Sequence, residues 1–125
     1  MRLLLDTHAI LWWLMDDRHL SGTAAAALDD ATNELFVSAV AAYEIGYKQG
    51  LGRLPLLPEG LPRRLQRASI TVLALSLSHA LAAAALPGPH RDPWDRIMIA
   101  QAQSEDLTVV TVDRVFANYR VPVLW

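Results

Sequence analysis

The sequence predicts an α/β protein, a three-layer α/β/α domain in which helices cover both faces of a central parallel sheet. Short apolar runs such as Leu3–Leu5 are typical of parallel strands that are buried on both faces. Along the chain these runs alternate with segments whose apolar residues recur at helical spacing. A chain of 125 residues is the size of one domain, so we expect a single domain over residues 1–125.

The composition fits a well-filled globular core and excludes several classes of protein. Apolar residues make up 53% of the chain, and the absence of cysteine rules out disulfides, thiolate metal sites and cysteine nucleophiles. The net charge of −2 provides no basic field for nucleic acid, so any such contact must be local. Acids interrupt the apolar start of the chain and no run is long enough to span a membrane, so we expect a cytoplasmic protein.

The first half of the chain predicts two strands and three helices. The first strand ends at Asp6, Ser21 is placed to cap the second helix, and two glycines, Gly50 and Gly52, end the third. The expected elements are strand 3–5, helix 7–15, helix 22–31, strand 35–38 and helix 40–51.

The second half predicts three helices and three strands. Ser78 is placed to cap one helix, Pro87-Gly88-Pro89 forms a loop, and Asp92 followed by Pro93 is typical of a helix N-cap and first turn. The expected elements are helix 59–68, strand 71–75, helix 78–86, helix 93–105, strand 108–111, a short helical turn and an edge strand 121–124.

Acidic residues recur where these elements end or begin. Asp6 ends the first strand, Asp113 follows the fourth, and Glu44 lies on the second turn of the helix after the second strand. Because parallel strands bring their carboxyl ends to one edge of a sheet, we expect these acids to converge there. Asp92 and Asp95 open the helix 93–105, but the spacing alone leaves open which edge of the sheet they reach.

Each of these acids also has a purely structural explanation. The aspartates could cap helices and turns, and Glu44 could pair with Lys48 on a solvated face. Elsewhere, however, we expect serine to cap the helices, and clustered carboxylates raise one another's pKa, which favours a functional reason for the cluster. Oxygen ligands suit Mg²⁺ or Mn²⁺, and an acidic pocket that holds such ions is suited to the hydrolysis of phosphodiesters.

Four blocks of the sequence, in the same order, resemble the PIN domain and more narrowly the VapC-type toxins of bacterial toxin–antitoxin pairs. The resemblance covers nearly the whole chain and implies strand order 3-2-1-4-5, a Mg²⁺- or Mn²⁺-dependent endoribonuclease, and a VapB-like antitoxin as partner. It also allows a homodimer. The blocks are Leu3 to Leu14, Ser38 to Ile45, His90 to Ala102, and Thr111 to Asp113 with Phe116.

Carried over residue by residue, the resemblance implies that four acids bind the metal and catalyse the reaction: Asp6, Glu44, Asp95 and Asp113. Asp95 matches better than Asp92, because the third acid of the family lies seven residues before the last alanine of the Ile-Ala-Gln-Ala run, here Ala102. Asp92 is then an extra acid that either supports the site or only caps the helix. The resemblance also puts the start of helix 93–105 at the acidic edge and implies supporting hydroxyls on Thr7, Ser38 and Thr111.

Cations close to these acids in sequence have two interpretations that stay open. Arg91, Arg96 and Arg114 either bind RNA phosphates or neutralise the acids. His90 is expected to support the site or to stack on RNA. The tryptophans Trp12, Trp13 and Trp94 are expected mainly in the core.

Two other enzyme classes that place aspartates at strand ends do not fit. A haloacid-dehalogenase-type phosphatase needs an aspartate at position 8, which is His8, and a receiver domain needs a lysine after its last core strand, whereas the single lysine is Lys48. The remaining alternative is a catalytically inactive PIN module that docks RNA or a protein partner.

Overall fold

In the computed structural model, which describes residues 1–88 and 90–125, five parallel strands form one sheet in the order β3-β2-β1-β4-β5. This confirms the parallel sheet and the order 3-2-1-4-5. Of the expected loop at 87–89, position 89 lies outside the described residues. The strands are β1 Arg2–Leu5, β2 Glu34–Ser38, β3 Ile70–Leu73, β4 Thr108–Val110 and β5 Val123–Leu124.

The central strand β1 organises the core. Leu3, Leu4 and Leu5 are fully buried, and β1 pairs with β2 on one side and β4 on the other. The backbone N–H of Asp6 donates to the carbonyl oxygen of Val110 at 3.2 Å, so the pairing continues one residue past the strand. The wholly apolar run therefore holds Asp6 firmly at the carboxyl edge of the sheet.

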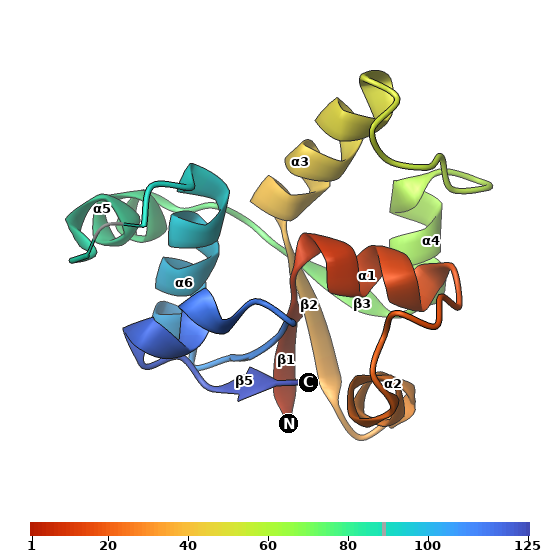
Figure 1. The fold of residues 1–125 in the computed structure, drawn as a ribbon, viewed down its shortest axis with the longest axis horizontal. Coiled ribbons are helices and arrows are strands. Elements are labelled where there is room, and N and C mark those ends of the chain that lie inside the picture. The colour runs from red at the N-terminus through yellow and green to blue at the C-terminus, as the bar shows by residue number, and fades with distance from the viewer. Residues whose placement is uncertain (89) are drawn as a thin grey trace.

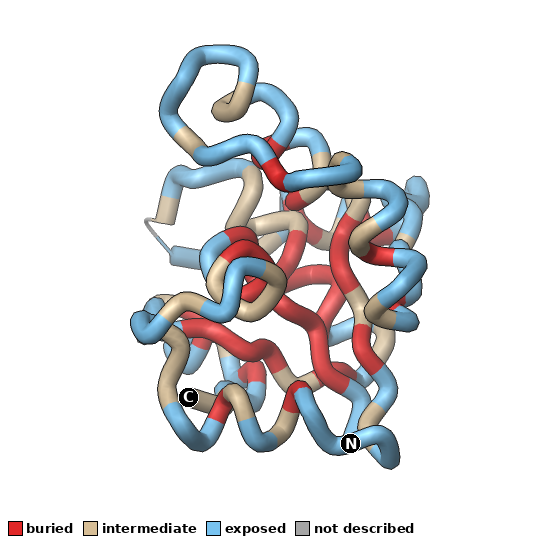
Figure 2. Tube along the Cα trace, turned by 90° about the vertical axis from the view of Figure 1, so that its right-hand side faces the viewer, coloured by how far each residue is buried: buried red, intermediate tan, exposed pale blue. Residues whose placement is uncertain are grey.

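Helices cover both sides of the sheet. Figure 1 shows α1, α2 and α4 on one side and α5, α6 and the 3-10 helix η1 on the other, and Figure 2 shows the buried segments gathered between them. Among the residues that the structure describes, none of the helices has the length and hydropathy of a membrane span. The helices are α1 Thr7–Leu14, α2 Gly22–Asp29, α3 Ala39–Gly50, α4 Leu61–Arg67, α5 Leu77–Ala85, α6 Pro93–Glu105 and η1 Arg114–Tyr119.

Two expected helix starts are wrong, each for a local reason. Helix α4 begins at Leu61 because Glu59 and Gly60 have φ angles of 70° and 82°, which no right-handed helix accommodates. The cap of α5 is Ser76 and not Ser78: its side chain accepts from the backbone of His79, whose ring accepts from the backbone of Ser76, forming a capping box. Strand β3 ends at Leu73, two residues earlier than expected.

Candidate metal centre

Five carboxylates line one pocket of about 410 Å³ at the carboxyl edge of the sheet. They come from the end of β1, from α3, from the start of α6 and from the segment after β4. The structure thus brings the four acids of the resemblance together with Asp92 and places the start of α6 at this edge. The residues that line the pocket are Asp6, Thr7, His8, Glu44, Lys48, Asp92, Asp95, Met98, Val112 and Asp113.

Asp6 is buried, and both of its carboxylate oxygens accept hydrogen bonds. Oδ1 accepts from the backbone N–H of Ala9 at 2.8 Å, which caps α1, and Oδ2 accepts from the hydroxyl of Thr111. Burial raises the pKa of Asp6 and the charge of Asp113 adds to this, although the bonds from Thr111 and Ala9 oppose it. Asp6 is therefore both a helix cap and a desolvated charge that favours a cationic partner.

Glu44 is also buried, with 9% of its surface exposed. The hydroxyl of Thr7 donates to Oε1 at 2.6 Å, and Lys48 Nζ lies 2.5 Å from Oε2. The expected pairing of Glu44 with Lys48 is therefore present, but it lies in the pocket and not on a solvated face. The spacing of four residues pairs Lys48 with Glu44, but it does not indicate whether the pair faces solvent or the pocket.

The start of α6 contributes two further carboxylates to the pocket, those of Asp92 and Asp95. Asp92 is exposed and caps the helix, accepting from the backbone N–H of Trp94 at 2.9 Å and of Asp95 at 3.4 Å. Asp95 Oδ2 lies 3.0 Å from His90 Nε2. Burial raises the pKa of Asp95, and the charges of Asp92 and Asp113 add to this, while the bond from His90 opposes it.

Asp113 is exposed and caps η1 by accepting from the backbone N–H of Val115 at 3.0 Å. Its own backbone N–H donates to Thr111 Oγ1 at 3.0 Å, so Thr111 connects Asp113 to Asp6. The charge of Asp113 raises the pKa values of both Asp6 and Asp95. These three carboxylates are therefore close enough to repel one another, as ligands of a shared cation would.

Ser38 takes a different place from the other hydroxyls. It is fully buried, and its Oγ accepts from the backbone N–H of Val40 at 3.1 Å, which caps α3. Thr7 and Thr111 bond directly to acids, whereas Ser38 acts on the site by fixing the start of the helix that carries Glu44.

The donor set fits a hard divalent cation. The pocket offers carboxylate oxygens from four parts of the chain and no cysteine, and burial raises the pKa of Asp6. In the described part of the chain, no three His, Cys, Asp or Glu side chains lie close enough to hold an ion as they stand. The acids share a pocket, and their oxygens are satisfied by Thr7, Lys48, His90 and Thr111.

Arg96 binds the backbone near the site and does not point to solvent. Its guanidinium donates to the carbonyl oxygens of His90 at 2.9 Å, Ala83 at 2.9 Å and Leu86 at 2.7 Å. It thereby joins the end of α5 to the segment that leads into α6. This geometry favours a structural role for Arg96 over both earlier interpretations, phosphate contact and neutralisation of the acids. Arg91 and Arg114, by contrast, are exposed.

We expect Arg96→Ala to lower the free energy of unfolding by about 3 kcal/mol, because three carbonyl groups lose a charged donor. Urea unfolding measures this change, with Arg63→Ala on the exposed part of α4 as the control. A loss within 0.5 kcal/mol of the control, roughly the scatter of surface substitutions, would contradict the structural role.

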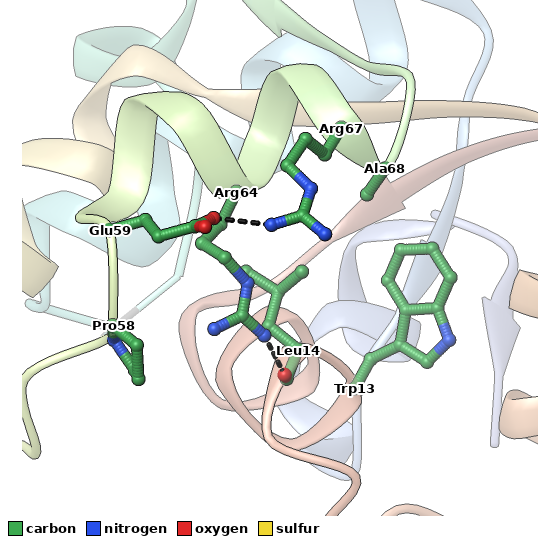
Figure 3. A pocket seen from close by; sticks show the side chains of 7 residues that line it. All are labelled: Trp13, Leu14, Pro58, Glu59, Arg64, Arg67 and Ala68. Atoms are coloured by element: carbon green, nitrogen blue, oxygen red, sulfur yellow. Dashed lines mark hydrogen bonds and ion pairs between the residues drawn. The ribbon is translucent and has the colours of Figure 1, made fainter.

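A second hollow, of about 490 Å³, lies between α1 and α4 (Figure 3). Arg64 donates to the carbonyl oxygen of Leu14 at the end of α1, and Arg67 pairs with Glu59. Both guanidinium groups are thus bonded within the protein, and the hollow offers a single carboxylate. It does not fit a divalent cation.

The tryptophans are less buried than expected. Trp12, Trp13 and Trp94 are all half-buried. Trp13 Nε1 donates to Asp29 at 3.0 Å, and Trp94 packs against Tyr43 with ring centroids 5.1 Å apart. None of the three belongs to the buried core, and of them Trp13 packs against it, so the expectation that they lie mainly in the core is not met.

This chain belongs to the PIN-domain family: the model of that family matches residues 3–122. It is 32% identical over 121 residues to Ribonuclease VapC22 from Mycobacterium tuberculosis (strain ATCC 25618 / H37Rv), covering 95% of this chain and 92% of that protein. Its fold is similar to a chain of VapBC2 from Rickettsia felis, solved bound to a DNA fragment from the promoter, with a TM-score of 0.72, 15% identity and coverage of 98% and 97%. It is also similar to a chain of FitAcB from Neisseria gonorrhoeae, with a TM-score of 0.68, 22% identity and coverage of 97% and 95%.

Proposed function

We propose that this protein is a Mg²⁺- or Mn²⁺-dependent endoribonuclease and the toxin of a toxin–antitoxin pair. The observation that carries this proposal is the convergence of five carboxylates in one pocket at the carboxyl edge of the sheet. The relationship to Ribonuclease VapC22 supports RNA as the substrate.

Asp6, Glu44, Asp95 and Asp113 would hold the ion, and Asp92 would act mainly as the cap of α6. A divalent cation in such a site makes water a better nucleophile at neutral pH and offsets charge on the phosphate. The product ends expected from this chemistry are a 5′-phosphate and a 3′-hydroxyl.

The other residues of the site keep the acids in place. Thr7 and Thr111 donate hydroxyl hydrogen bonds to Glu44 and Asp6, respectively, which orients the two carboxylates. Asp6 is further restrained because it ends β1 and caps α1. Arg91 and Arg114, which are exposed and adjacent in sequence to acids of the site, are candidates to contact RNA phosphates.

The partner we propose is a VapB-like antitoxin. The support is that the chain resembles chains from the VapBC2 and FitAcB structures over nearly its full length. Co-expression with the product of the adjacent gene, followed by purification through a tag on this chain, would test it. A stable complex that lacks ribonuclease activity is expected, and full activity of the complex would contradict the proposal.

The alternative is an inactive PIN module that binds RNA or protein. The observation in its favour is that the acids are bonded to Thr7, Lys48, His90 and Thr111 and form no ready-made three-ligand group among the described residues. Calorimetric titration with Mn²⁺ separates the two: heat at millimolar metal or below is expected of the nuclease, and its absence favours the module.

The direct test of the nuclease is cleavage of RNA by the purified protein. We expect cleavage in Mg²⁺ or Mn²⁺, none in EDTA, and 5′-phosphate ends on the products. Cleavage that persists in EDTA, or fragments with 2′,3′-cyclic phosphate ends, would contradict the metal-dependent mechanism.

A further inference from the structure

Lys48 lines the acidic pocket together with the five carboxylates. It follows Glu44 by one turn of α3, and its Nζ lies 2.5 Å from Glu44 Oε2. The Lys48 side chain is 33% exposed, against 11% for Glu44. The Lys48 side chain therefore both contacts the buried carboxylate and is partly open to solvent.

The ion pair by itself does not account for this position. Glu44 already accepts a hydrogen bond from Thr7 on its other oxygen, and an i,i+4 pair contributes only about 0.3–0.5 kcal/mol on a helix surface. An ammonium group has three N–H donors, and within the described residues the acceptor of Lys48 is Glu44 Oε2 alone. Lys48, which lines the pocket, thus has donor capacity available to another acceptor.

The charge of the pocket indicates what that acceptor is. An RNA phosphate is an anion that must approach five carboxylates, and Lys48 is the one Lys or Arg among the residues that line the described pocket. Arg96 is bound to three carbonyl oxygens. During cleavage, further negative charge accumulates on the phosphate oxygens, and a fixed donor aimed at that charge lowers the barrier.

We propose that Lys48 is a catalytic residue that donates a hydrogen bond to a non-bridging oxygen of the scissile phosphate. The proposal rests on the nuclease function above and adds to it a residue outside the set of acids. In the reaction, water forms a new P–O bond and gives one proton to solvent, the P–O3′ bond breaks, and the leaving 3′ oxygen takes one proton from solvent to become a hydroxyl. Lys48 transfers no proton in this step and stabilises the charge on the phosphate.

The test compares Lys48→Gln, Lys48→Arg and the control Arg53→Gln, which removes a positive charge from an exposed position after α3. Each variant is measured for thermal unfolding, for Mn²⁺ affinity by calorimetry, and for single-turnover cleavage of RNA at saturating Mn²⁺.

For Lys48→Gln we expect a loss of cleavage of about 10²-fold, as when one donor to a developing anion is removed. Its Mn²⁺ affinity should be unchanged or tighter, because a competing cation has left the pocket. Lys48→Arg should recover part of the cleavage rate, and Arg53→Gln should match the wild type.

Three results would overturn the proposal. Cleavage by Lys48→Gln within about threefold of the wild type would show that no phosphate contact is made. A parallel loss of Mn²⁺ affinity and cleavage would show that Lys48 only organises Glu44. If Lys48→Gln does not fold, a Lys48→Arg variant that folds but shows weaker Mn²⁺ binding without a change in single-turnover rate would also contradict it. A wild-type protein that neither binds Mn²⁺ nor cleaves RNA would instead remove the proposed function, and this inference with it.

Discussion

Asp6→Asn is expected to abolish metal-dependent cleavage while the protein stays folded. Asparagine keeps the oxygen that caps α1 through the N–H of Ala9, so the helix start is preserved, but the buried charge that would hold the cation is lost. The loss of cleavage should reach at least about 10³-fold, the upper range for removing one group that stabilises the transition state. Single-turnover cleavage and Mn²⁺ calorimetry measure it.

The control is Asp106→Asn, the same substitution at an exposed residue that ends α6 with a φ angle of 55°. Asparagine tolerates this left-handed conformation, so this variant should cleave RNA like the wild type. Substantial cleavage by Asp6→Asn would contradict a role for Asp6 in the metal site and would favour the inactive-module interpretation.

The second large effect concerns stability and its dependence on pH. Burial raises the pKa of Asp6 in the folded protein above its ordinary value of 3.8, so the folded state holds a proton more tightly than the unfolded state. Ionised Asp6 therefore destabilises the metal-free protein, and the wild type loses this part of its stability as pH rises from below 3.8 through the raised pKa. Asparagine does not titrate, so in EDTA the stability of Asp6→Asn relative to the wild type should improve between pH 4 and pH 7.5.

At pH 7.5, Mn²⁺ should raise the stability of the wild type relative to that of Asp6→Asn. A ligand that binds only the folded state stabilises it by about 2.7 kcal/mol at 100 times its dissociation constant, and the wild type should gain this while Asp6→Asn gains little. Thermal unfolding of both proteins at the two pH values, with EDTA or Mn²⁺, tests the whole pattern. A relative stability of Asp6→Asn that falls as pH rises in EDTA would contradict the raised pKa of Asp6.

The layers of the fold and the convergence of three of the five carboxylates, including Glu44, could be predicted from local patterns in the sequence. Wholly apolar runs can only be buried on both faces, so β1 and the parallel sheet followed from composition and spacing. Parallel strands share a carboxyl edge, so the convergence of Asp6 and Asp113 followed from their positions after strands. These are consequences of local sequence and of one rule of topology.

The rest of the site depends on the path of loops and on contacts between distant segments, which sequence spacing does not specify. The edge reached by Asp95 depends on the segment between α5 and α6, where Arg96 binds three carbonyl oxygens that no periodicity could indicate. The place of Lys48 depends on which face of α3 packs toward the pocket, because an i,i+4 pair has the same spacing on a wet face as beside a buried acid. Sequence spacing specifies neighbours along one helix, and only the packing of helices against the sheet specifies which of those neighbours face the site.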